Sequence, residues 1–208
     1  MKKELKIMLE SIAAGMMIGV GAISFLSAES KIVSSFLFVI GMFTICTFKL
    51  NLFTGKVCYI PDNKPSYLWF VTKVWIGNFI GTYLVAVLLK STRLNNSLIT
   101  KAQSLVDAKI NDSLLSLLIL GIFCGILIYV TVDNYAKNPH EIGKYAAVFM
   151  GVMVFLMCGF EHSVADMFYF SFCSAWNLNT LIRILIISLG NIIGGCLLPI
   201  LRSIKADA

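Results

Sequence analysis

Long apolar runs alternate with short polar segments along the whole chain. A helix that crosses a bilayer needs about 20 mostly apolar residues, so runs of this length predict transmembrane helices. Two of the runs are interrupted by polar residues, one at 49–51 and the other at 158–167. The segment 90–111 is polar, and we expect it to be irregular and to lie outside the membrane. The pattern therefore predicts six spans, with approximate bounds 8–26, 32–60, 67–89, 113–132, 144–176 and 181–201.

The composition indicates an integral membrane protein of the helical type. Of the 208 residues, 58% are hydrophobic and 13% are charged, which is more apolar than usual for a soluble domain. Too little chain lies between the runs for a separate soluble domain, so we expect one transmembrane domain over 1–208. The net charge of +6 comes mostly from span ends and is no argument for nucleic-acid binding. The six cysteines are scattered and lack a C-x-x-C pair, which favours reduced packing residues over disulfides.

The N-terminal residues allow two interpretations. Three lysines at positions 2, 3 and 6, an apolar segment at 12–26 and small residues at 27–28 resemble a signal peptide. The same pattern fits a first transmembrane helix with a basic cytoplasmic start. Small residues recur at short spacing over 13–22, which suits close helix packing in a membrane. We therefore favour the helix.

Basic residues of the short loops set the expected orientation. With the N-terminus inside, nine Lys and Arg residues fall on the cytoplasmic side and six on the outer side. This bias predicts a multi-pass protein of the cytoplasmic (inner) membrane with both termini in the cytoplasm. The nine are Lys2, Lys3, Lys6, Lys56, Lys64, Lys137, Lys144, Arg202 and Lys205, and the six are Lys31, Lys90, Arg93, Lys101, Lys109 and Arg183.

The third and sixth predicted spans share the pattern G-N-x-I-G, at 77–81 and 190–194. Each copy follows an interrupted span, so the chain divides into two halves of three spans, about 8–90 and 111–203. An odd number of spans gives the halves opposite orientations, and such inverted repeats place a substrate site at their interface near mid-bilayer. The paired glycines would let a neighbouring helix come close. Asn78 and Asn191 would hydrogen-bond to the irregular backbone of the interrupted spans.

Ionisable residues lie inside the fifth run, where Glu161, His162 and Asp166 follow Gly159. At bilayer depth such groups usually face a cavity or a pathway, and broken helices near mid-bilayer recur in transport proteins. One hypothesis is therefore a transport site centred on His162. The other is a buried histidine that hydrogen-bonds to Glu161 and only stabilises a helix bundle.

These motifs together resemble the formate/nitrite transporter family. The similarity lies in F-E-H-S-V-A-D-M-F at 160–168, L-F-T-G at 52–55 and the two G-N-x-I-G segments, and it covers nearly the whole chain. It implies an aquaporin-like fold of six transmembrane helices with the second and fifth broken, and a homopentamer with one pore per protomer. It also implies small monovalent anions as substrates: formate, nitrite, hydrosulfide and, in some members, lactate or acetate.

The resemblance also assigns the substrate pathway. His162 would be the central histidine, and the loop that breaks the second helix would face it. From outside to inside, the pathway would pass an outer constriction, the central histidine and an inner constriction. A basic residue at the start of the fourth span would lie in the outer vestibule. The residues are Leu52, Phe53 and Thr54 in the loop, Phe155 and Phe38 in the outer constriction, Met42 and Leu52 in the inner one, and Lys109 in the vestibule, with Asn78 and Asn191 beside the breaks.

The chain departs from the family pattern at the two breaks. Asn51 stands where many members have Glu, and Asp166 stands where many have Asn. The two changes suggest that one carboxylate has moved from one broken helix to the other. We expect Glu161, Asp166 and Asn51 to support the helix breaks, with Glu161 holding backbone.

The chemistry of the anions suggests a mechanism. Desolvation makes an anion costly in the bilayer core, and formate, nitrite and hydrosulfide become neutral when they gain a proton. Histidine, with an unperturbed pKa of about 6.5, suits this task. The alternative mechanism is a plain channel in which a protonated His162 binds the anion and no proton moves.

Two other classes remain as alternatives, although we expect a protein that is not an enzyme and has no cofactor. A membrane metalloenzyme would use Glu161, His162 and Asp166 as ligands, but the other histidine, His140, lies in a predicted loop. An aquaporin-like channel for neutral solutes would share the fold, yet the paired N-P-A signature is absent.

Overall fold

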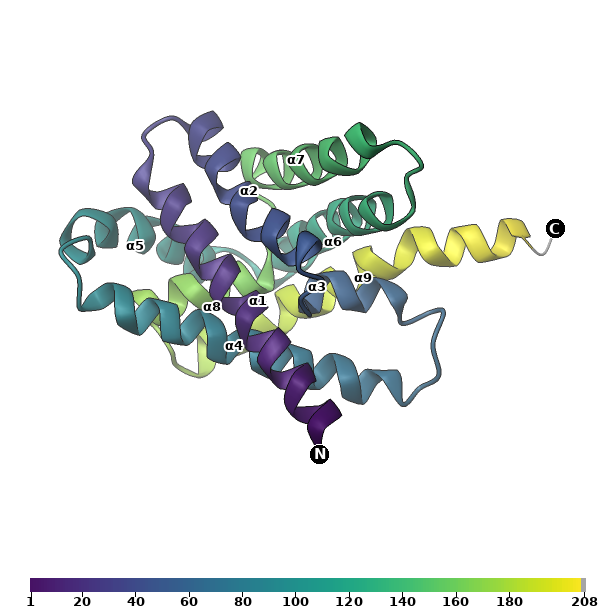
Figure 1. Ribbon diagram of the computed structural model, residues 1–208. Coiled ribbons are helices and arrows are strands. Elements are labelled where there is room, and N and C mark those ends of the chain that lie inside the picture. The colour runs from purple at the N-terminus through teal and green to yellow at the C-terminus, as the bar shows by residue number, and fades with distance from the viewer. Residues whose placement is uncertain (207–208) are drawn as a thin grey trace.

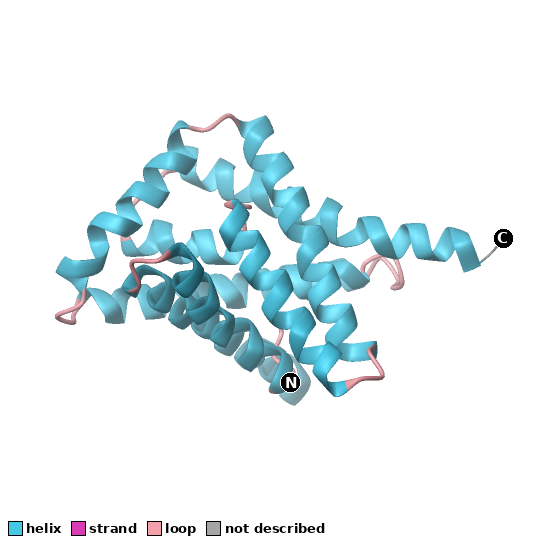
Figure 2. Cartoon of the chain, turned by 90° about the horizontal axis from the view of Figure 1, so that it is seen from above, coloured by secondary structure: helices cyan, strands magenta, loops and turns pink. Residues whose placement is uncertain are grey.

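The computed structural model describes residues 1–206, and within this range the chain is helical with no strand (Figures 1 and 2). Only short loops join the helices (Figure 2). The elements are α1 (Lys2–Ser27), α2 (Lys31–Thr47), α3 (Phe53–Lys56), the 3-10 helix η1 (Val57–Tyr59), α4 (Tyr67–Lys90), α5 (Asn95–Asn111), α6 (Leu114–Lys137), α7 (Glu141–Cys158), α8 (Ser163–Phe172) and α9 (Leu178–Ala206).

Among the described residues, five helices are long and apolar enough to cross a membrane, namely α1, α4, α6, α7 and α9. The helix α2 is apolar as well but has 17 residues, because it ends at the first interruption. Large apolar side chains are exposed along most of these helices. The prediction of an all-helical membrane protein is confirmed, while the count of six spans stays a prediction.

The segment 90–111 contradicts the sequence analysis, because most of it is helical. It contains α5, which buries Leu98, Ala102 and Val106 on one face. These residues are four apart, so they lie on one stripe of the helix. Most of the remaining positions are polar, which is why an apolar run of membrane length was absent there.

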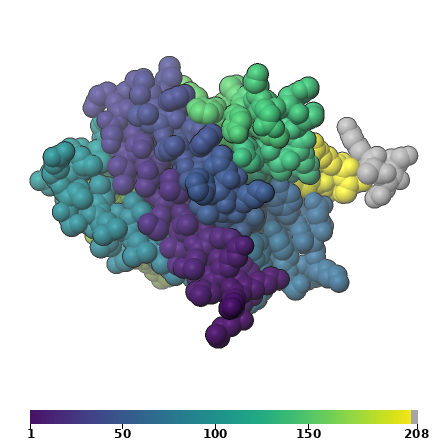
Figure 3. Space-filling model, in the orientation of Figure 1, coloured from purple at the N-terminus to yellow at the C-terminus, as the bar shows by residue number. Residues whose placement is uncertain are grey.

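The helices form two pairs of long, closely packed neighbours (Figure 1): α1 packs on α4, and α6 packs on α9. The helices α2 and α7 lie side by side. Figure 3 shows α1, α2 and α7 across the viewed face of the molecule. The corresponding pairs α1–α4 and α6–α9 are what two related halves would produce, and the bounds of those halves stay a prediction.

The glycines of the two G-N-x-I-G segments bring these helix pairs together. A Cβ at Gly81 would collide with the backbone oxygen of Ile12 on α1, and a Cβ at Gly194 would collide with that of Ile122 on α6. The expectation that these glycines allow close helix approach is therefore confirmed.

Both interrupted spans break where the sequence places polar residues. After α2 the backbone turns at Lys49, which has a positive φ of 57°, and α3 begins at Phe53. After α7 the chain turns at Gly159, with φ 73° in the left-handed region, which glycine adopts without a steric penalty. The two breaks bring five polar residues into the interior, namely Asn51, Thr54, Glu161, His162 and Asp166.

Candidate functional site

Asn78 on α4 supports the first break through three hydrogen bonds. Its Oδ1 accepts from the backbone N–H of Phe53 at 2.7 Å. Its Nδ2 donates to the backbone oxygens of Ser11 at 2.7 Å and Asn51 at 2.9 Å. The side chain thus ties the broken segment to α1.

Asn191 on α9 makes the corresponding bonds at the second break. Its Oδ1 accepts from the N–H of Ser163 at 3.0 Å, and its Nδ2 donates to the oxygens of Gly121 and Glu161, both at 2.9 Å. The bonds that we expected from both asparagines to irregular backbone are present. Their amides are occupied by backbone, however, so we no longer place Asn78 and Asn191 in contact with substrate.

His162 and Thr54 come from different breaks and meet in the interior. Both side chains are buried, and His162 Nε2 lies 2.8 Å from Thr54 Oγ1. The other ring nitrogen, Nδ1, accepts from the backbone N–H of Ala165 at 3.1 Å and so caps α8. Because that N–H donates, Nδ1 carries no proton, and Nε2–H donates to Thr54. The geometry therefore defines a neutral imidazole whose proton is on Nε2.

Two phenylalanines close the space beside this histidine. The ring of Phe155 stacks on His162 with centroids 5.6 Å apart and planes at 19°. Phe38 meets Phe155 edge to face at 6.0 Å, and both phenylalanines are buried. Any solute moving past His162 on this side must displace aromatic side chains.

A small cavity of about 70 Å³ lies on the same side, and His162 and Phe155 are among its lining residues. Since one water requires about 10–15 Å³ of such space, the cavity has room for a few waters or one small anion. We call it the small cavity. Its other lining residues are Phe25, Leu105, Lys109, Leu156, Gly159, Phe160, Ala165, Asp166 and Tyr169.

Lys109 lines the small cavity, and its ammonium group is paired with two carboxylates. It lies near the end of α5 instead of at the start of the fourth span. Its Nζ is 2.6 Å from Glu161 Oε2 and 3.1 Å from Asp166 Oδ1. These two carboxylates compensate the charge of the lysine, and its role in drawing an anion inward stays a prediction.

The side chain of Glu161 also has a different partner from the one that the sequence analysis considered. Its carboxylate pairs with Lys109, and the partners of His162 are Thr54 and the backbone N–H of Ala165. A histidine hydrogen-bonded to Glu161 is therefore not present. The backbone oxygen of Glu161, not its side chain, takes part in the support of the break.

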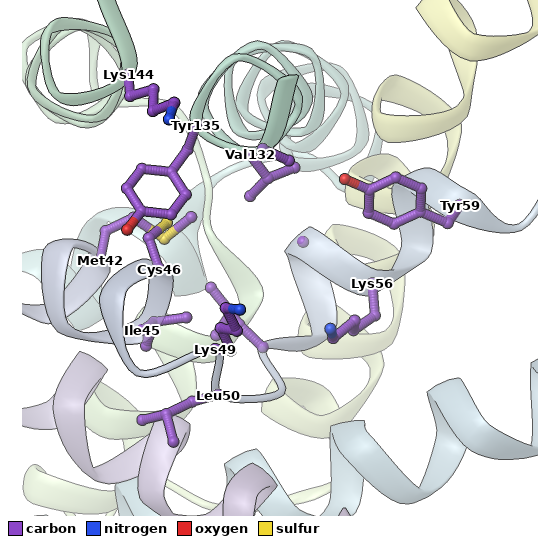
Figure 4. Close-up of a pocket in the computed structure, with 13 residues that line it drawn as sticks. Met42, Ile45, Cys46, Lys49, Leu50, Lys56, Tyr59, Val132, Tyr135 and Lys144 are labelled. Atoms are coloured by element: carbon purple, nitrogen blue, oxygen red, sulfur yellow. The ribbon is translucent and has the colours of Figure 1, made fainter. Parts of the chain in front are cut away.

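A large cavity of about 580 Å³ opens on the other side of the first break (Figure 4). Leu52 and Met42 line it, whereas Phe53 is buried and lines neither cavity. Figure 4 shows Lys49 and Lys56 at its wall, one on each side of the break. The full lining is Met42, Ile45, Cys46, Lys49, Leu50, Leu52, Gly55, Lys56, Tyr59, Val132, Tyr135, Ala136 and Lys144.

The sequence analysis did not single out Lys49 and Lys56 as residues that line a cavity. Neither Lys49 nor Lys56 forms an ion pair with a residue that the structure describes, and no described Asp or Glu lines the large cavity. Lys144, the third lysine of the wall, pairs with Glu141 at 2.5 Å. The signal was present in K-L-N-L-F-T-G-K at 49–56, where a lysine precedes and follows the conspicuous L-F-T-G.

Asn51 also has an unexpected partner. Its Nδ2 donates to Glu10 Oε2 on α1 at 2.8 Å. A carboxylate is thus present near this break although residue 51 is not acidic. The idea that a carboxylate simply moved from one broken helix to the other is incomplete, because α1 supplies a second one.

Metal binding finds no support in the arrangement of side chains. In the part of the chain that the structure describes, no group of three or more His, Cys, Asp or Glu residues is arranged to hold a metal ion. Asp166 and Glu161 face Lys109 instead.

A helical membrane protein with two broken helices and a buried polar pair between two cavities has the architecture of a channel or transporter. The chain belongs to the formate/nitrite transporter family, whose model matches residues 2–203. This family comprises membrane transporters and channels, so the protein is not an enzyme.

Curated relatives agree with this membership. A probable formate transporter of Methanothermobacter thermautotrophicus is 24% identical over 196 residues, which cover 80% of this chain and 72% of the relative. The formate channel FocA of Escherichia coli (strain K12) is 22% identical over 187 residues, which cover 80% of this chain and 66% of FocA.

Solved structures share the fold. An FNT family ion channel superposes with a TM-score of 0.84 at 23% identity, covering 97% of this chain and 90% of that one. A pentameric formate channel with formate bound superposes with a TM-score of 0.80 at 20% identity, covering 99% of this chain and 96% of that one. The predicted resemblance and fold class are thereby confirmed.

Proposed function

We propose that the protein carries small monovalent weak-acid anions (formate, nitrite or hydrosulfide) across the cytoplasmic membrane, through a pore in each protomer that passes His162. The observation that supports this most is the buried His162–Thr54 pair, which joins the two breaks between the two cavities. Formate is the substrate named for the relatives and the bound ligand named for one structural neighbour.

The pathway connects the large cavity with the small one, and the gradient sets the direction of net flux. Lys49 and Lys56 attract the anion into the large cavity, and Met42 with Leu52 forms the first constriction. Thr54 accepts a hydrogen bond from His162, so its own O–H remains to donate to the anion.

Phe38 and Phe155 form the second constriction and exclude water from the passing solute. Such a constriction opposes a charged species far more than a neutral acid. The substrate therefore gains a proton near His162 and crosses the aromatic barrier as the neutral acid.

Orientation and assembly complete the proposal. Both termini lie in the cytoplasm, and the small cavity faces outward. In support, Lys101 on α5 donates to the backbone oxygen of Leu26, so α5 lies at the end of α1 opposite the N-terminus. The protein forms a homopentamer; in support, the similar formate channel with formate bound is pentameric.

The test is anion flux in proteoliposomes that contain the purified protein and an internal pH dye. Formate, nitrite and hydrosulfide are expected to enter together with a proton, whereas chloride, the anion of a strong acid, is not. Equal chloride flux without a pH change would establish a plain anion channel instead.

Replacing the histidine tests its place in the pathway. His162→Phe is expected to lower formate flux by at least about tenfold, because a ring without Nε2–H loses the bond to Thr54 and narrows the route. The matched control is His140→Phe, since His140 is exposed outside the site. A His162→Phe protein with unchanged flux and an unchanged pH profile would remove His162 from the mechanism.

A further inference from the structure

The cluster of Lys109, Glu161 and Asp166 beside the small cavity contains more negative than positive charge. One ammonium faces two carboxylates, at 2.6 Å and 3.1 Å. The three side chains are 11%, 8% and 3% exposed, so water screens them little. His162 does not restore the balance, because the N–H of Ala165 occupies its Nδ1 and holds the ring neutral.

An uncompensated buried charge is strongly unfavourable, and a negative one would repel an anion that enters the small cavity. Two carboxylates in one site relieve this by holding one proton between them. With that proton the cluster is neutral.

The hydrogen-bond geometry locates the proton. Glu161 Oε2 and Asp166 Oδ1 both face Lys109 Nζ. Asp166 Oδ2 is buried and has no hydrogen-bond partner among the described residues. An unpaired buried oxygen on a residue that lines a cavity is suited to carry a hydrogen that donates into that cavity.

We propose that Asp166 is a proton-carrying binding site for the transported anion: its protonated Oδ2 donates a hydrogen bond to a small weak-acid anion in the small cavity and passes the proton to it. This proposal rests on the proposed function and names the proton donor that the proposed function leaves open.

The proton transfer balances. The O–H bond of Asp166 breaks, its electron pair stays on Oδ2, and a new O–H or S–H bond forms on the anion. Lys109 Nζ, 3.1 Å from Oδ1, stabilises the carboxylate that remains. The neutral acid then moves past Phe155 and Phe38, and a proton from the outer solution restores Asp166 through the small cavity.

The other titratable groups around Asp166 are few. They come from α5, the second break, α6 and α8: Lys109, Glu161, His162, Cys124 and Tyr169. Arg183 on α9 lies near the cluster, but its guanidinium donates to the backbone oxygens of Lys109 and Asp112. The pH response of the cavity is therefore assigned to the carboxylate pair.

Infrared spectroscopy of the purified full-length protein tests the protonation without any transport. At neutral pH the wild type is expected to show the C=O stretch of a buried neutral carboxyl group that Asp166→Asn lacks. The control Asp107→Asn changes an exposed acid on α5 and should retain the band. A wild-type spectrum identical to that of Asp166→Asn in this region would overturn the proposal.

Formate uptake in proteoliposomes tests the donor role. Asp166→Asn keeps the size and can still donate hydrogen bonds, but it has no proton to release to the anion. Protons taken up per formate are expected to fall at least tenfold, and Asp166→Glu is expected to restore them. Unchanged proton uptake in Asp166→Asn, or failure of a folded Asp166→Glu protein to restore it, would contradict the donor role. Absence of formate, nitrite and hydrosulfide flux in the wild type would instead overturn the proposed function. The infrared spectra would still report the protonation of Asp166, because they do not depend on transport.

Discussion

The two ring nitrogens of His162 have different partners, and this decides what the residue can do. Nδ1 caps α8 by accepting from the N–H of Ala165, and Nε2 contacts Thr54. A second proton on Nδ1 would face that N–H and break the cap. His162 is therefore suited to orient Thr54 and the anion as a neutral donor, and less suited to be the binding cation of a plain channel.

Replacing Thr54 tests this arrangement. Thr54→Val keeps the shape but removes the hydroxyl that accepts from Nε2–H and can donate to an anion. A hydrogen bond to a charged group is worth about 1.5–3 kcal/mol, so formate flux is expected to fall about 10- to 150-fold. Initial rates of labelled formate uptake in proteoliposomes measure the change.

The matched control is Thr82→Val. Thr82 is equally buried, but its hydroxyl donates to the backbone oxygen of Phe79 within α4, whereas that of Thr54 contacts His162. The formate flux of the Thr82→Val protein should stay within about twofold of wild type. Equal losses in both variants would mean that any buried threonine matters, and would refute a direct role for Thr54.

At this scale the sequence predicts some residues well and others poorly. His162 and Thr54 follow from short motifs, and the structure places them in contact. The pairing of Lys109 does not follow, because it depends on how α5 ends against the second break. Glu10 was missed for the same reason, since 41 residues separate it from Asn51.

Among the elements, the two broken spans depend on one asparagine each. A helix break inside a membrane leaves backbone groups that water cannot satisfy. Asn78 and Asn191 each satisfy two such groups and bind one carbonyl of a neighbouring helix, and both lie between glycines that press their helix against a neighbour. The glycines and the asparagine therefore form one structural unit in each half.

Asn191→Leu is expected to destabilise the protein strongly. It leaves the N–H of Ser163 and the oxygens of Gly121 and Glu161 without this partner. At about 1–3 kcal/mol for each of the two groups at the break, the loss is at least about 2 kcal/mol. The midpoint of thermal unfolding in detergent measures it.

Asn134→Leu provides the comparison. Asn134 on α6 is partly buried, and its Nδ2 donates to Val130 in its own helix. This substitution should cost about 1 kcal/mol or less. If Asn191→Leu unfolded at the same temperature as Asn134→Leu, the bonds to the break would have no stabilising role.

The sequence predicts these elements because each break interrupts an apolar run, which is a strong signal. The sequence analysis failed for α5, where the buried stripe is only Leu98, Ala102 and Val106 on a mostly polar segment. A search for membrane-length runs passes over such a helix, although its four-residue period is visible.

For the whole molecule, the contrast between the two cavities is electrostatic. The lysine of the small cavity is compensated by two carboxylates. The lysines of the large cavity, Lys49 and Lys56, have no acidic partner among the described residues, and Lys56 is only partly exposed. Anions are therefore expected to collect at the large cavity, which the proposed orientation places on the cytoplasmic side.

Vesicles of opposite orientation test this asymmetry. In Lys49→Gln/Lys56→Gln protein, the KM for formate at the cytoplasmic face is expected to rise about fivefold or more, since one charge at about 4 Å contributes about 1 kcal/mol in water and more near a protein surface. Uptake into inside-out vesicles measures this face, and uptake into right-side-out vesicles should change less than twofold. Higher salt should weaken entry into wild-type inside-out vesicles and have little effect on the variant.

Lys64→Gln separates this local effect from a general loss of positive surface charge. Lys64 lies exposed in the loop before α4 and lines no part of the large cavity. If it raised the KM as much as the double variant, the attraction would belong to the whole cytoplasmic surface. If the double variant raised the KM for formate equally at both faces, the lysines would act on the central site or on folding. A selective effect at one face would mean that the carrier loads anions more readily from the cytoplasm, although the gradient still sets the direction of net flux.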